Sequence, residues 1–312
     1  MDISIIIPIY NDAELVEDFI NCFEPLTKIN KLDNFEVIFV NDGSSKDNEK
    51  LLNETISHLS SHYKVIHFSR NFGQHIALSA GYKYAVGDYI CMLNVDMQDP
   101  PEEIFNLYSF IKENNLDIVY GLRELRKDPF LTKISSLAFN WILNKLTGNK
   151  TPLNVATVRV MSRRFIDAYN NFSEKTRYIP GLESWLGFES SYLPVCHKAR
   201  KKGKSSYNFR KKLLMATESI ISFSDLPLRM ISIVGLILGL VGLLLTVFLI
   251  IAKFFFIDFQ SGYTSIISTI LLIGGFQISI IGLASLYIGR ILKEVQNRPL
   301  YVIKELVNIS DI

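Results

Sequence analysis

A short stretch of this chain carries several oxygen-bearing side chains directly after an apolar run. The run is Tyr89–Leu93, and its composition is typical of a buried strand. The oxygen donors that follow it are Asn94, Asp96, Gln98 and Asp99. Carboxylate and amide oxygens at this spacing can hold one hard divalent cation, whose other ligands are waters and a substrate diphosphate. The stretch therefore predicts a cation site of that kind.

The position of these donors favours a site, although the stretch alone leaves a second interpretation open. Pro100–Pro101 stops the strand and can open a helix at Glu102, so the donors lie at a carboxyl end of a strand. Open α/β sheets hold their ligands at such ends. Acidic residues are also common in ordinary polar turns, so other parts of the chain must decide between the two.

Apolar and helical patterns alternate through the first part of the chain. The expected strands are Ile3–Ile9, Phe35–Val40, Lys64–Ser69 and Tyr89–Leu93. A helical pattern starts near Ala13, with Asp12 as an N-cap, and another covers His75–Ala85. Such alternation predicts a mostly parallel sheet with helices on both faces, in which the polar turns at successive strand ends converge.

The turn after the first strand carries no glycine-rich phosphate motif. Neither G-x-G-x-x-G nor a Walker A sequence follows Ile3–Ile9, which argues against a dinucleotide fold and a P-loop enzyme. A base and ribose would instead be held by Pro8, Tyr10, Asn11 and Asp42. Ordinary turn chemistry accounts for Tyr10 and Asn11 equally well.

Composition points to contact with lipid and away from nucleic acid. Hydrophobic residues make up 48% of the 312 residues, and the mean hydropathy of +0.21 is high for a wholly soluble protein. A net charge of +2 is too small to suggest nucleic acid binding. Cys22, Cys91 and Cys196 have no C-x-x-C spacing, so we expect reduced, mostly buried thiols. No signal peptide is visible at the amino terminus.

The last third of the chain has the pattern of a membrane anchor. Residues 1–212 are expected to form the catalytic domain, 213–229 an amphipathic helix in the membrane interface, and 290–312 a cytoplasmic tail. A transmembrane hairpin is expected over 230–289, with spans at about 230–252 and 266–289. Both spans are uncharged, long enough for a hydrocarbon core of ~30 Å, and apolar on every face, unlike a buried soluble helix.

Flanking charges predict the orientation of this hairpin. Arg and Lys precede the first span and follow the second, whereas the linker carries only Lys253 and Asp258. The positive-inside rule therefore places both termini in the cytoplasm. Gly235 and Gly239 form a G-x-x-x-G pair that allows close helix packing, so a homo-oligomer formed through the hairpin is expected.

Eight segments occur in the order and spacing of a known family. They are IIIPIYND, VNDGSSKD, SRNFGQHIALSAGY, NVDMQDPPEE, VRVMSRR, RYIPGLESWLGF, ARKKGKSSY and SFSDLPLR. The set resembles family 2 glycosyltransferases, and most of all the bacterial polyprenyl-phosphate glycosyltransferases related to dolichyl-phosphate mannose synthase. The resemblance covers nearly the whole chain. It implies a GT-A fold, which is a Rossmann-like α/β domain, a nucleotide-sugar donor, Mg²⁺ or Mn²⁺, and a lipid phosphate acceptor.

The resemblance assigns roles to individual residues. Asp42 matches the family's nucleotide-binding aspartate, and Asp96 the second acid of its D-x-D motif. Gln98 matches the glutamine that joins the metal, whereas Asn94 replaces the first aspartate, so the metal set is Asn94, Asp96 and Gln98. An amide oxygen can still coordinate the metal, but the site then relies more on the donor diphosphate. The implied nucleotide-sugar contacts are Pro8, Tyr10, Asn11, Asp12, Asp42, Arg70, Gln74, Asn94, Val95, Asp96, Arg200, Ser205 and Tyr207.

A second departure lies in the strand expected over Asn154–Met161. Many relatives carry an acidic residue two positions before the arginine that matches Arg159, but this chain has Thr157, which cannot act as a base near neutral pH. A phosphate monoester has its second pKa near ~6 and is already ionised, so the nucleophile needs positioning more than deprotonation. The implied catalytic set is Asp96, Arg159, Thr157 and Arg123.

Cations for the acceptor phosphate are available around the site. The expected set is Arg123, Arg126, Lys133, Ser136 and Arg159, although Arg126 and Lys133 fit a lipid-facing basic rim equally well. The run His197–Tyr207 resembles the family's R-x-x-G-x-S-x-Y loop, which closes over the donor diphosphate. It also reads as a polybasic segment beside a membrane, and both uses are compatible.

These observations predict an inverting, metal-dependent hexosyltransferase in the bacterial inner membrane. It would move sugar from a nucleotide diphosphate sugar, expected to be a UDP-sugar, to undecaprenyl phosphate for modification of a cell-envelope glycan. One alternative is a weakened relative that acts as a nucleotide-sugar-binding or scaffold protein. Another is transfer to a soluble or polysaccharide acceptor, although two spans are too few for the pore of a processive synthase.

Overall fold

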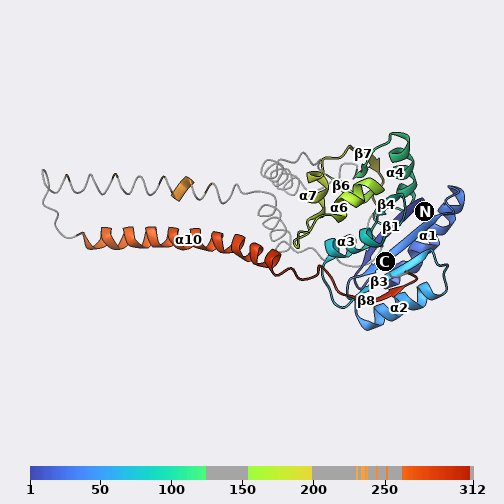
Figure 1. Ribbon diagram of the computed structural model, residues 1–312, viewed down its shortest axis with the longest axis horizontal. Coiled ribbons are helices and arrows are strands. Elements are labelled where there is room, and N and C mark those ends of the chain that lie inside the picture. Colours follow the sequence, from blue (N-terminus) through green and yellow to red (C-terminus); the bar gives the residue numbers. More distant parts are fainter. Residues whose placement is uncertain are drawn as a thin grey trace. The chain divides into compact units, whose positions relative to one another are not determined.

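The structure is a computed structural model that describes residues 1–123, 154–198 and 262–309, with isolated positions between 230 and 251. The chain divides into two compact units. One comprises Met1–Lys212 together with Pro299–Ile312, and the other comprises Leu213–Arg298. Figure 1 shows the described elements of both units.

Strands and helices alternate in the first unit. Up to residue 123 the elements are β1 (Ile3–Ile9), the 3-10 turn η1 (Ala13–Leu15), α1 (Val16–Ile29), β2 (Phe35–Asn41), α2 (Lys46–Ser57), β3 (Tyr63–Phe68), α3 (Gln74–Tyr84), β4 (Tyr89–Met92), α4 (Glu102–Glu113) and β5 (Ile118–Arg123). Beyond the first gap they are β6 (Val155–Ser162), α6 (Arg163–Asn170), α7 (Ile179–Trp185), β7 (Ser190–Val195) and β8 (Ile303–Val307). Each expected strand is thus confirmed to within about two residues at its ends, the usual uncertainty of such boundaries.

The described strands form one sheet in the order β7-β5-β6-β4-β1-β2-β3-β8. Strands β4, β1, β2 and β3 run parallel to one another, as do β5 and β7, whereas β6 pairs antiparallel with β4 and β5, and β8 pairs antiparallel with β3. The expected mostly parallel α/β sheet is therefore confirmed, and it fits a GT-A-like architecture. The antiparallel β6 matters for the site, because it lays Arg159 directly opposite Met92 at the end of β4.

Helices cover both faces of this sheet, as the alternation predicts (Figure 1). On one face, Ile5 and Ile7 of β1 join a buried cluster with Phe19 and Phe23 of α1. On the other face α3 lies very close to β1, since a Cβ added at Gly81 would come within 2.2 Å of the Ile6 side chain. Glycine at position 81 therefore permits the close helix-sheet approach that brings the start of α3 to the strand ends.

Two local expectations need correction. Asp12 is the N-cap residue of η1, but its side chain makes no capping hydrogen bond, and the α-helix begins only at Val16. In contrast, Ser45 does cap α2, because its hydroxyl accepts from the Asn48 amide. All three cysteines are free, but Cys22 and Cys196 are exposed and only Cys91 is buried, so the expectation of mostly buried thiols is wrong.

Residues near the carboxyl terminus complete the edge of the sheet. The sequence analysis assigned 290–312 to a tail, whereas Ile303–Val307 form β8, antiparallel to β3. The Tyr301 ring stacks on Phe68 with centroids 5.0 Å apart, and Lys304 Nζ lies 2.5 Å from Glu49 Oε1. The strand satisfies backbone groups that an edge strand would otherwise present to solvent.

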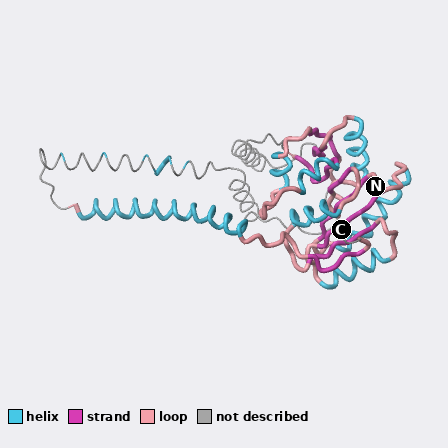
Figure 2. Tube along the Cα trace, viewed as in Figure 1, coloured by secondary structure: helices cyan, strands magenta, loops and turns pink. Residues whose placement is uncertain are grey.

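The second unit contains α10 (Tyr263–Val295), the long helix drawn in Figure 2. A Cβ added at Gly235 would lie 3.7 Å from Ile280 Cδ1, so two distant segments of this unit approach each other. Within the part of the chain that the structure describes, no helix combines the length and apolarity needed to cross a membrane. The expected transmembrane hairpin is therefore not confirmed, and the expected interfacial helix at 213–229 lies outside the described residues.

Candidate functional site

The turns after β1 and β2 are joined by hydrogen bonds at one edge of the sheet. Asn11, which has a left-handed φ of 58°, accepts from the Ser45 amide at 2.9 Å through Oδ1. The backbone N–H of Asn11 donates to Ser44 Oγ at 2.9 Å. The Asn11 side chain is therefore used to fix the two turns relative to each other, which is the turn chemistry that the sequence left open.

Asp42 joins the turn after β2 to the loop after β3. Its carboxylate is buried and accepts from the Phe72 amide at 2.6 Å and the Gly73 amide at 2.9 Å. Burial raises the pKa of Asp42 above its ordinary value, and these two amide bonds partly oppose that rise. Gly73 has a φ of 103°, which favours glycine, and it lets the loop present both amides. The nucleotide contact expected of Asp42 stays a prediction.

A buried polar network supports the same turn from behind. Asn41 Oδ1 accepts from the Ser44 amide, so Asn41 Nδ2 donates to His67 Nδ1 at 2.9 Å. His67 Nε2 must then carry the proton that is donated to Asn53 Oδ1 at 2.8 Å. Burial lowers the pKa of His67, which agrees with this neutral form. The sequence signal of this network is a histidine, His67, within a mostly apolar strand, and it was not recognised as one.

The remaining residues expected at the nucleotide differ in exposure. Tyr10 is 50% exposed, and the Arg70 guanidinium lies 4.7 Å from the centroid of the Phe72 ring. Pro8 is part of β1, Asp12 occupies the N-cap position of η1, and Val95 is buried in the loop after β4. The turns of four neighbouring parallel strands thus bring these residues to one edge of the sheet.

The loop after β4 alternates between half-buried and buried positions. Asn94, Asp96 and Gln98 are half-buried, while the residues between them are buried. The side-chain Nε2 of Gln74 donates to Asn94 Oδ1 at 3.2 Å, and the backbone N–H of Gln98 donates to Asp96 Oδ1 at 3.2 Å. Met97 takes a left-handed φ of 52°, which tightens the loop. The three expected metal ligands therefore share the more open side of one short turn.

This donor set fits a hard cation of a particular kind. One carboxylate and two amides supply only oxygen ligands with a single formal charge, which suits Mg²⁺ or Mn²⁺ if phosphate oxygens complete the shell. Among the described residues, no group of three His, Cys, Asp or Glu side chains is placed to hold a metal.

Asp99 ends the same loop but has a different environment. It is buried, and its Oδ2 accepts from Arg123 Nη2 at 3.2 Å and from the Thr157 amide at 3.1 Å. Its Oδ1 lies 3.0 Å from His197 Nδ1. Burial raises the pKa of this carboxyl, but Arg123 and His197 outweigh it and leave the pKa below its ordinary value. Asp99 therefore ties the loop to β5, β6 and the end of β7.

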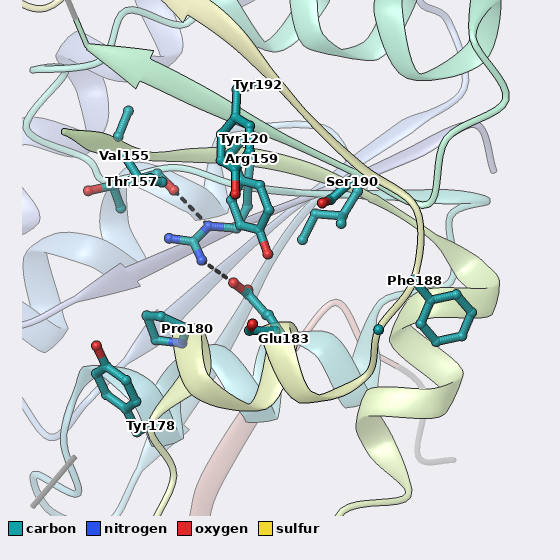
Figure 3. A pocket seen from close by; sticks show the side chains of 14 residues that line it. Tyr120, Val155, Thr157, Arg159, Tyr178, Pro180, Glu183, Phe188, Ser190 and Tyr192 are labelled. Carbon is teal, nitrogen blue, oxygen red and sulfur yellow. Dashed lines mark hydrogen bonds and ion pairs between the residues drawn. The ribbon is translucent and has the colours of Figure 1, made fainter. Parts of the chain in front are cut away.

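Arg159 also lies in an enclosed environment (Figure 3). It is 7% exposed, its Nη1 donates to Glu183 Oε2 at 2.5 Å, and its Nε donates to Thr157 O at 3.2 Å. Burial would lower the pKa of the guanidinium, but the Glu183 carboxylate raises it above its ordinary value, so Arg159 keeps its positive charge. The positive charge expected to meet the acceptor phosphate is thus compensated by a carboxylate.

A cavity of about 500 Å³ lies beside this ion pair, between β5, β6, β7 and α7 (Figure 3). Register places Arg159, Tyr120 and Tyr192 in one row across the sheet. The guanidinium lies 5.5 Å from the Tyr120 ring, which stacks on Tyr192 with centroids 5.4 Å apart. The residues that line the cavity include Tyr120, Thr157, Arg159, Tyr178, Pro180, Glu183, Ser184, Phe188, Ser190 and Tyr192.

The structure thus brings together most of the expected residues that it describes, but in two groups. The first group surrounds Asp96 and Gln74, and the second contains Arg123, Thr157 and Arg159. The expected residues Arg126, Lys133, Ser136, Arg200, Ser205 and Tyr207 lie outside the described residues. Sequence reasoning missed Glu183, whose signal was a carboxylate within the otherwise uncharged helix Ile179–Trp185.

The chain is similar in sequence to known proteins over nearly its full length. The model of the family "Glycosyl transferase family 2" matches residues 4–169. An uncharacterized glycosyltransferase of Synechocystis is 34% identical over 310 residues, which cover 98% of this chain and 96% of that protein. The undecaprenyl-phosphate 4-deoxy-4-formamido-L-arabinose transferase of Proteus mirabilis is 32% identical over 314 residues, with coverage of 99% and 94%.

A solved structure with a similar fold is that of glucosyl-3-phosphoglycerate synthase from Mycobacterium tuberculosis in complex with Mn²⁺, UDP-glucose and phosphoglyceric acid. It is 15% identical, with a TM-score of 0.48 and coverage of 71% of this chain and 78% of that one. The family match and the full-length relatives carry the conclusion: this chain belongs to glycosyl transferase family 2.

Proposed function

We propose that the protein is a metal-dependent inverting transferase that moves sugar from a UDP-sugar to undecaprenyl phosphate. The observation that carries the proposal is the loop after β4, where Asn94, Asp96 and Gln98 share the open side at the carboxyl end of a central parallel strand. Relatives named as undecaprenyl-phosphate sugar transferases, which match nearly the full length of this chain, support the choice of acceptor.

The donor diphosphate would lie against this loop. A cation held by Asn94, Asp96 and Gln98 would neutralise charge on the departing nucleotide diphosphate. An oxygen of the lipid phosphate forms a bond to the anomeric carbon from the opposite side while the bond to the diphosphate oxygen breaks, which inverts the configuration. The attacking phosphate is already ionised near neutral pH, since its second pKa is near ~6. Thr157 in place of an acid is therefore compatible with turnover.

The two described arginines of the acceptor set differ in what they offer. Arg123 Nε is buried and has no hydrogen-bond partner among the described residues, so a donor is left for a phosphate oxygen. Arg159 is held by Glu183 and by Thr157 O. We therefore assign the direct phosphate contact to Arg123, together with Arg126, Lys133 and Ser136 from the undescribed segment, and give Arg159 a supporting position.

We further propose that the enzyme is anchored in the bacterial inner membrane with its catalytic unit and both termini in the cytoplasm. The two uncharged stretches at about 230–252 and 266–289 support this, and so does their charge asymmetry. Large apolar side chains of α10, such as Ile270, Ile278 and Ile281, are more than half exposed in the single chain. Lipid, or a second copy in a homo-oligomer, would cover them.

The direct test is lipid-linked product formation. Full-length protein in detergent is incubated with undecaprenyl phosphate, Mn²⁺ and a panel of UDP- and GDP-sugars labelled in the sugar, and label is counted in the organic phase. We expect label from at least one UDP-sugar, and label at a rate about 100-fold lower with Asp96→Asn. If nucleotide sugars bind but no lipid product forms with any donor, the chain acts as a nucleotide-sugar-binding relative, and the proposal is wrong.

A further inference from the structure

We propose that the cavity between β5, β6, β7 and α7 receives the transferred sugar, and that Glu183 selects sugars whose hydroxyl or amino groups donate a hydrogen bond to it. The inference rests on the proposed function and names the part of the substrate that this cavity recognises. Its basis is the position of the cavity, the charge of its lining, and one unpartnered oxygen atom.

The cavity adjoins the loop expected to hold the metal. The antiparallel pairs of β4 and β6 end at Met92 opposite Arg159, where the loop after β4 begins. Thr157 lines the cavity, and its amide bonds Asp99 of the same loop at 3.1 Å. The site for the diphosphate and the cavity thus share a wall, as a diphosphate and the sugar attached to it require.

Tyr178 and His75 form a second connection between the cavity and the loop after β4. Tyr178 lines the cavity and packs edge-to-face on His75 with centroids 6.0 Å apart. His75 follows Gln74, whose side chain donates to Asn94 Oδ1 at 3.2 Å. The cavity is therefore connected to the metal loop through β6 on one side and through the start of α3 on the other.

The charge of the lining disfavours a phosphate and favours a sugar. The Arg159 charge is compensated by Glu183 at 2.5 Å, so an anion entering here would face a carboxylate without an uncompensated cation. The other polar groups of the lining are the side chains of Tyr120, Tyr178, Tyr192, Thr157, Ser184 and Ser190. Hydroxyls and aromatic rings around a carboxylate suit a polyhydroxylated ligand, and about 500 Å³ is the size of a small-molecule pocket.

The Oε1 atom of Glu183 indicates that the ligand must supply a hydrogen-bond donor. Glu183 is 3% exposed, and although its Oε2 accepts from Arg159, its Oε1 is buried with no hydrogen-bond partner among the described residues. Burial raises the pKa of Glu183 above its ordinary value, although the Arg159 charge and, to a smaller extent, a hydrogen bond from the Tyr120 hydroxyl to the same carboxyl group oppose the rise. A buried acceptor without a donor is costly, and a sugar O–H or N–H in the cavity would remove that cost.

This arrangement predicts discrimination among sugars. A carboxylate accepts hydrogen bonds but donates none, so a sugar that presents hydroxyl or amino groups gains affinity. A sugar acid would bring a second negative charge into the same buried space and be rejected. The sequence supplies the selecting group on α7, away from the loop that holds the nucleotide, so sugar choice and nucleotide binding can be separated by mutation.

The experiment is isothermal titration calorimetry on full-length protein with Mn²⁺, using UDP, UDP-glucose, UDP-N-acetylglucosamine and UDP-glucuronic acid. The variant is Glu183→Gln, which keeps the size of the side chain. The matched control is Glu36→Gln, since Glu36 is also a buried carboxylate in an ion pair, with Lys64 at 2.6 Å. Its partner Val86 lies at the amino-terminal side of β4, away from the cavity. Tyr120→Phe, which removes one hydroxyl beside Glu183, is a milder second variant.

We expect Glu183→Gln to weaken binding of at least one neutral UDP-sugar by about 10-fold, as for loss of a hydrogen bond to a charged group, and to leave UDP binding unchanged. Discrimination against UDP-glucuronic acid should fall in the same variant, Tyr120→Phe should have a smaller effect in the same direction, and Glu36→Gln should have none. Equal affinity of wild type and Glu183→Gln for every UDP-sugar would overturn the inference. If wild type binds neither UDP nor any UDP-sugar, the proposed donor class is wrong and this inference falls with it.

Discussion

The two halves of the sheet use charged residues in opposite ways. At the ends of β1 to β4, the side chains on the open side of the metal loop are Asn94, Asp96 and Gln98, which carry one formal charge and stay half-buried. In the half made by β5, β6 and β7, Arg123 pairs with Asp99 and Arg159 pairs with Glu183. One half thus leaves oxygen atoms accessible, and the other compensates its charges internally.

This difference indicates which half depends on its substrate for completion. A site with one carboxylate gains most of its cation affinity when a diphosphate arrives, because the phosphate oxygens add charge and ligands. A half built from internal ion pairs is already organised before any substrate binds, since each charge has a fixed partner. We therefore expect mutations of the loop after β4 to change metal binding and rate, and mutations that leave one member of an internal ion pair without its partner, such as Asp99→Asn, to lower stability.

The largest effect should come from Asp99→Asn. The substitution leaves Arg123 and His197 without their carboxylate inside the second half, which should lower the free energy of unfolding by ~3 kcal/mol. For a unit of this size that is a fall in Tm of roughly 10 °C. Thermal unfolding of the full-length protein measures it. A Tm equal to that of wild type would mean that the Asp99 contacts contribute little, and the comparison would fail.

Asp96→Asn should change activity instead. It removes the only carboxylate of the expected metal set, so we expect kcat to fall by about 100-fold, equivalent to ~2.7 kcal/mol of transition-state stabilisation. Its Tm should match wild type, because Asp96 is half-buried and accepts from the neighbouring Gln98 amide. The product assay with undecaprenyl phosphate, run beside Asp99→Asn, separates the two halves. A large loss of Tm in Asp96→Asn would contradict the division.

His75 lies where the two halves meet and should make the protein sensitive to acid. Burial, and then the Arg159 charge, lower the pKa of His75 to about 4. Because this pKa is below the unfolded value of ~6.5, the stabilising effect of the neutral ring is complete above that pH and is lost as the pH falls. The loss is ~1.4 kcal/mol per pH unit, or about 2 kcal/mol at pH 5.

Thermal unfolding between pH 7 and pH 4.5 measures this effect in wild type and in His75→Gln. The variant should lose stability less steeply over the interval, because the glutamine amide does not titrate. Parallel curves for the two proteins would show that His75 contributes nothing to the acid sensitivity. Buried His67, whose pKa is also lowered by burial, accounts for part of the remaining slope.

The parallel half of the fold was accessible from sequence because its signals are local. Runs such as Ile3–Ile9 and Phe35–Val40 are β-branched and bounded by polar turns, and parallel strands with helical crossovers bring their carboxyl ends to one edge. The expectation that Asn94 and Asp96 lie at such an end follows directly. The helix cap made by Ser45 depends on equally local signals, because its hydroxyl accepts from Asn48, only three residues further along the chain.

The second half could not be predicted because its partners are distant in sequence. Arg159 was assigned to a phosphate, since nothing near it in the chain indicates that Glu183 of α7 would neutralise it. Asp99 was grouped with the metal ligands by spacing, but only the fold shows that Arg123 and His197 occupy its oxygens. Strand β8 was missed for the same reason, because its partner β3 lies more than 200 residues earlier.

The smallest effect tests how far the first half depends on its substrate. Asn94→Asp restores a second carboxylate beside Asp96, and its oxygen can keep the bond from Gln74 Nε2 that Asn94 Oδ1 accepts at 3.2 Å. We expect the affinity for Mn²⁺ without nucleotide to rise by about 10-fold, equivalent to ~1.4 kcal/mol, with a smaller gain when UDP is present. Calorimetry with Mn²⁺ alone and with Mn²⁺ plus UDP measures both.

The matched control is Asn115→Asp, which adds the same charge at an exposed turn after α4. Asn115 has a left-handed φ of 51°, a conformation that aspartate tolerates. The control should leave Mn²⁺ affinity unchanged, because an exposed charge outside the site is screened by salt. If wild type already binds Mn²⁺ equally tightly with and without UDP, the amide at position 94 has not weakened the site. The proposed contrast would then be lost, because both halves of the sheet would be organised before substrate arrives.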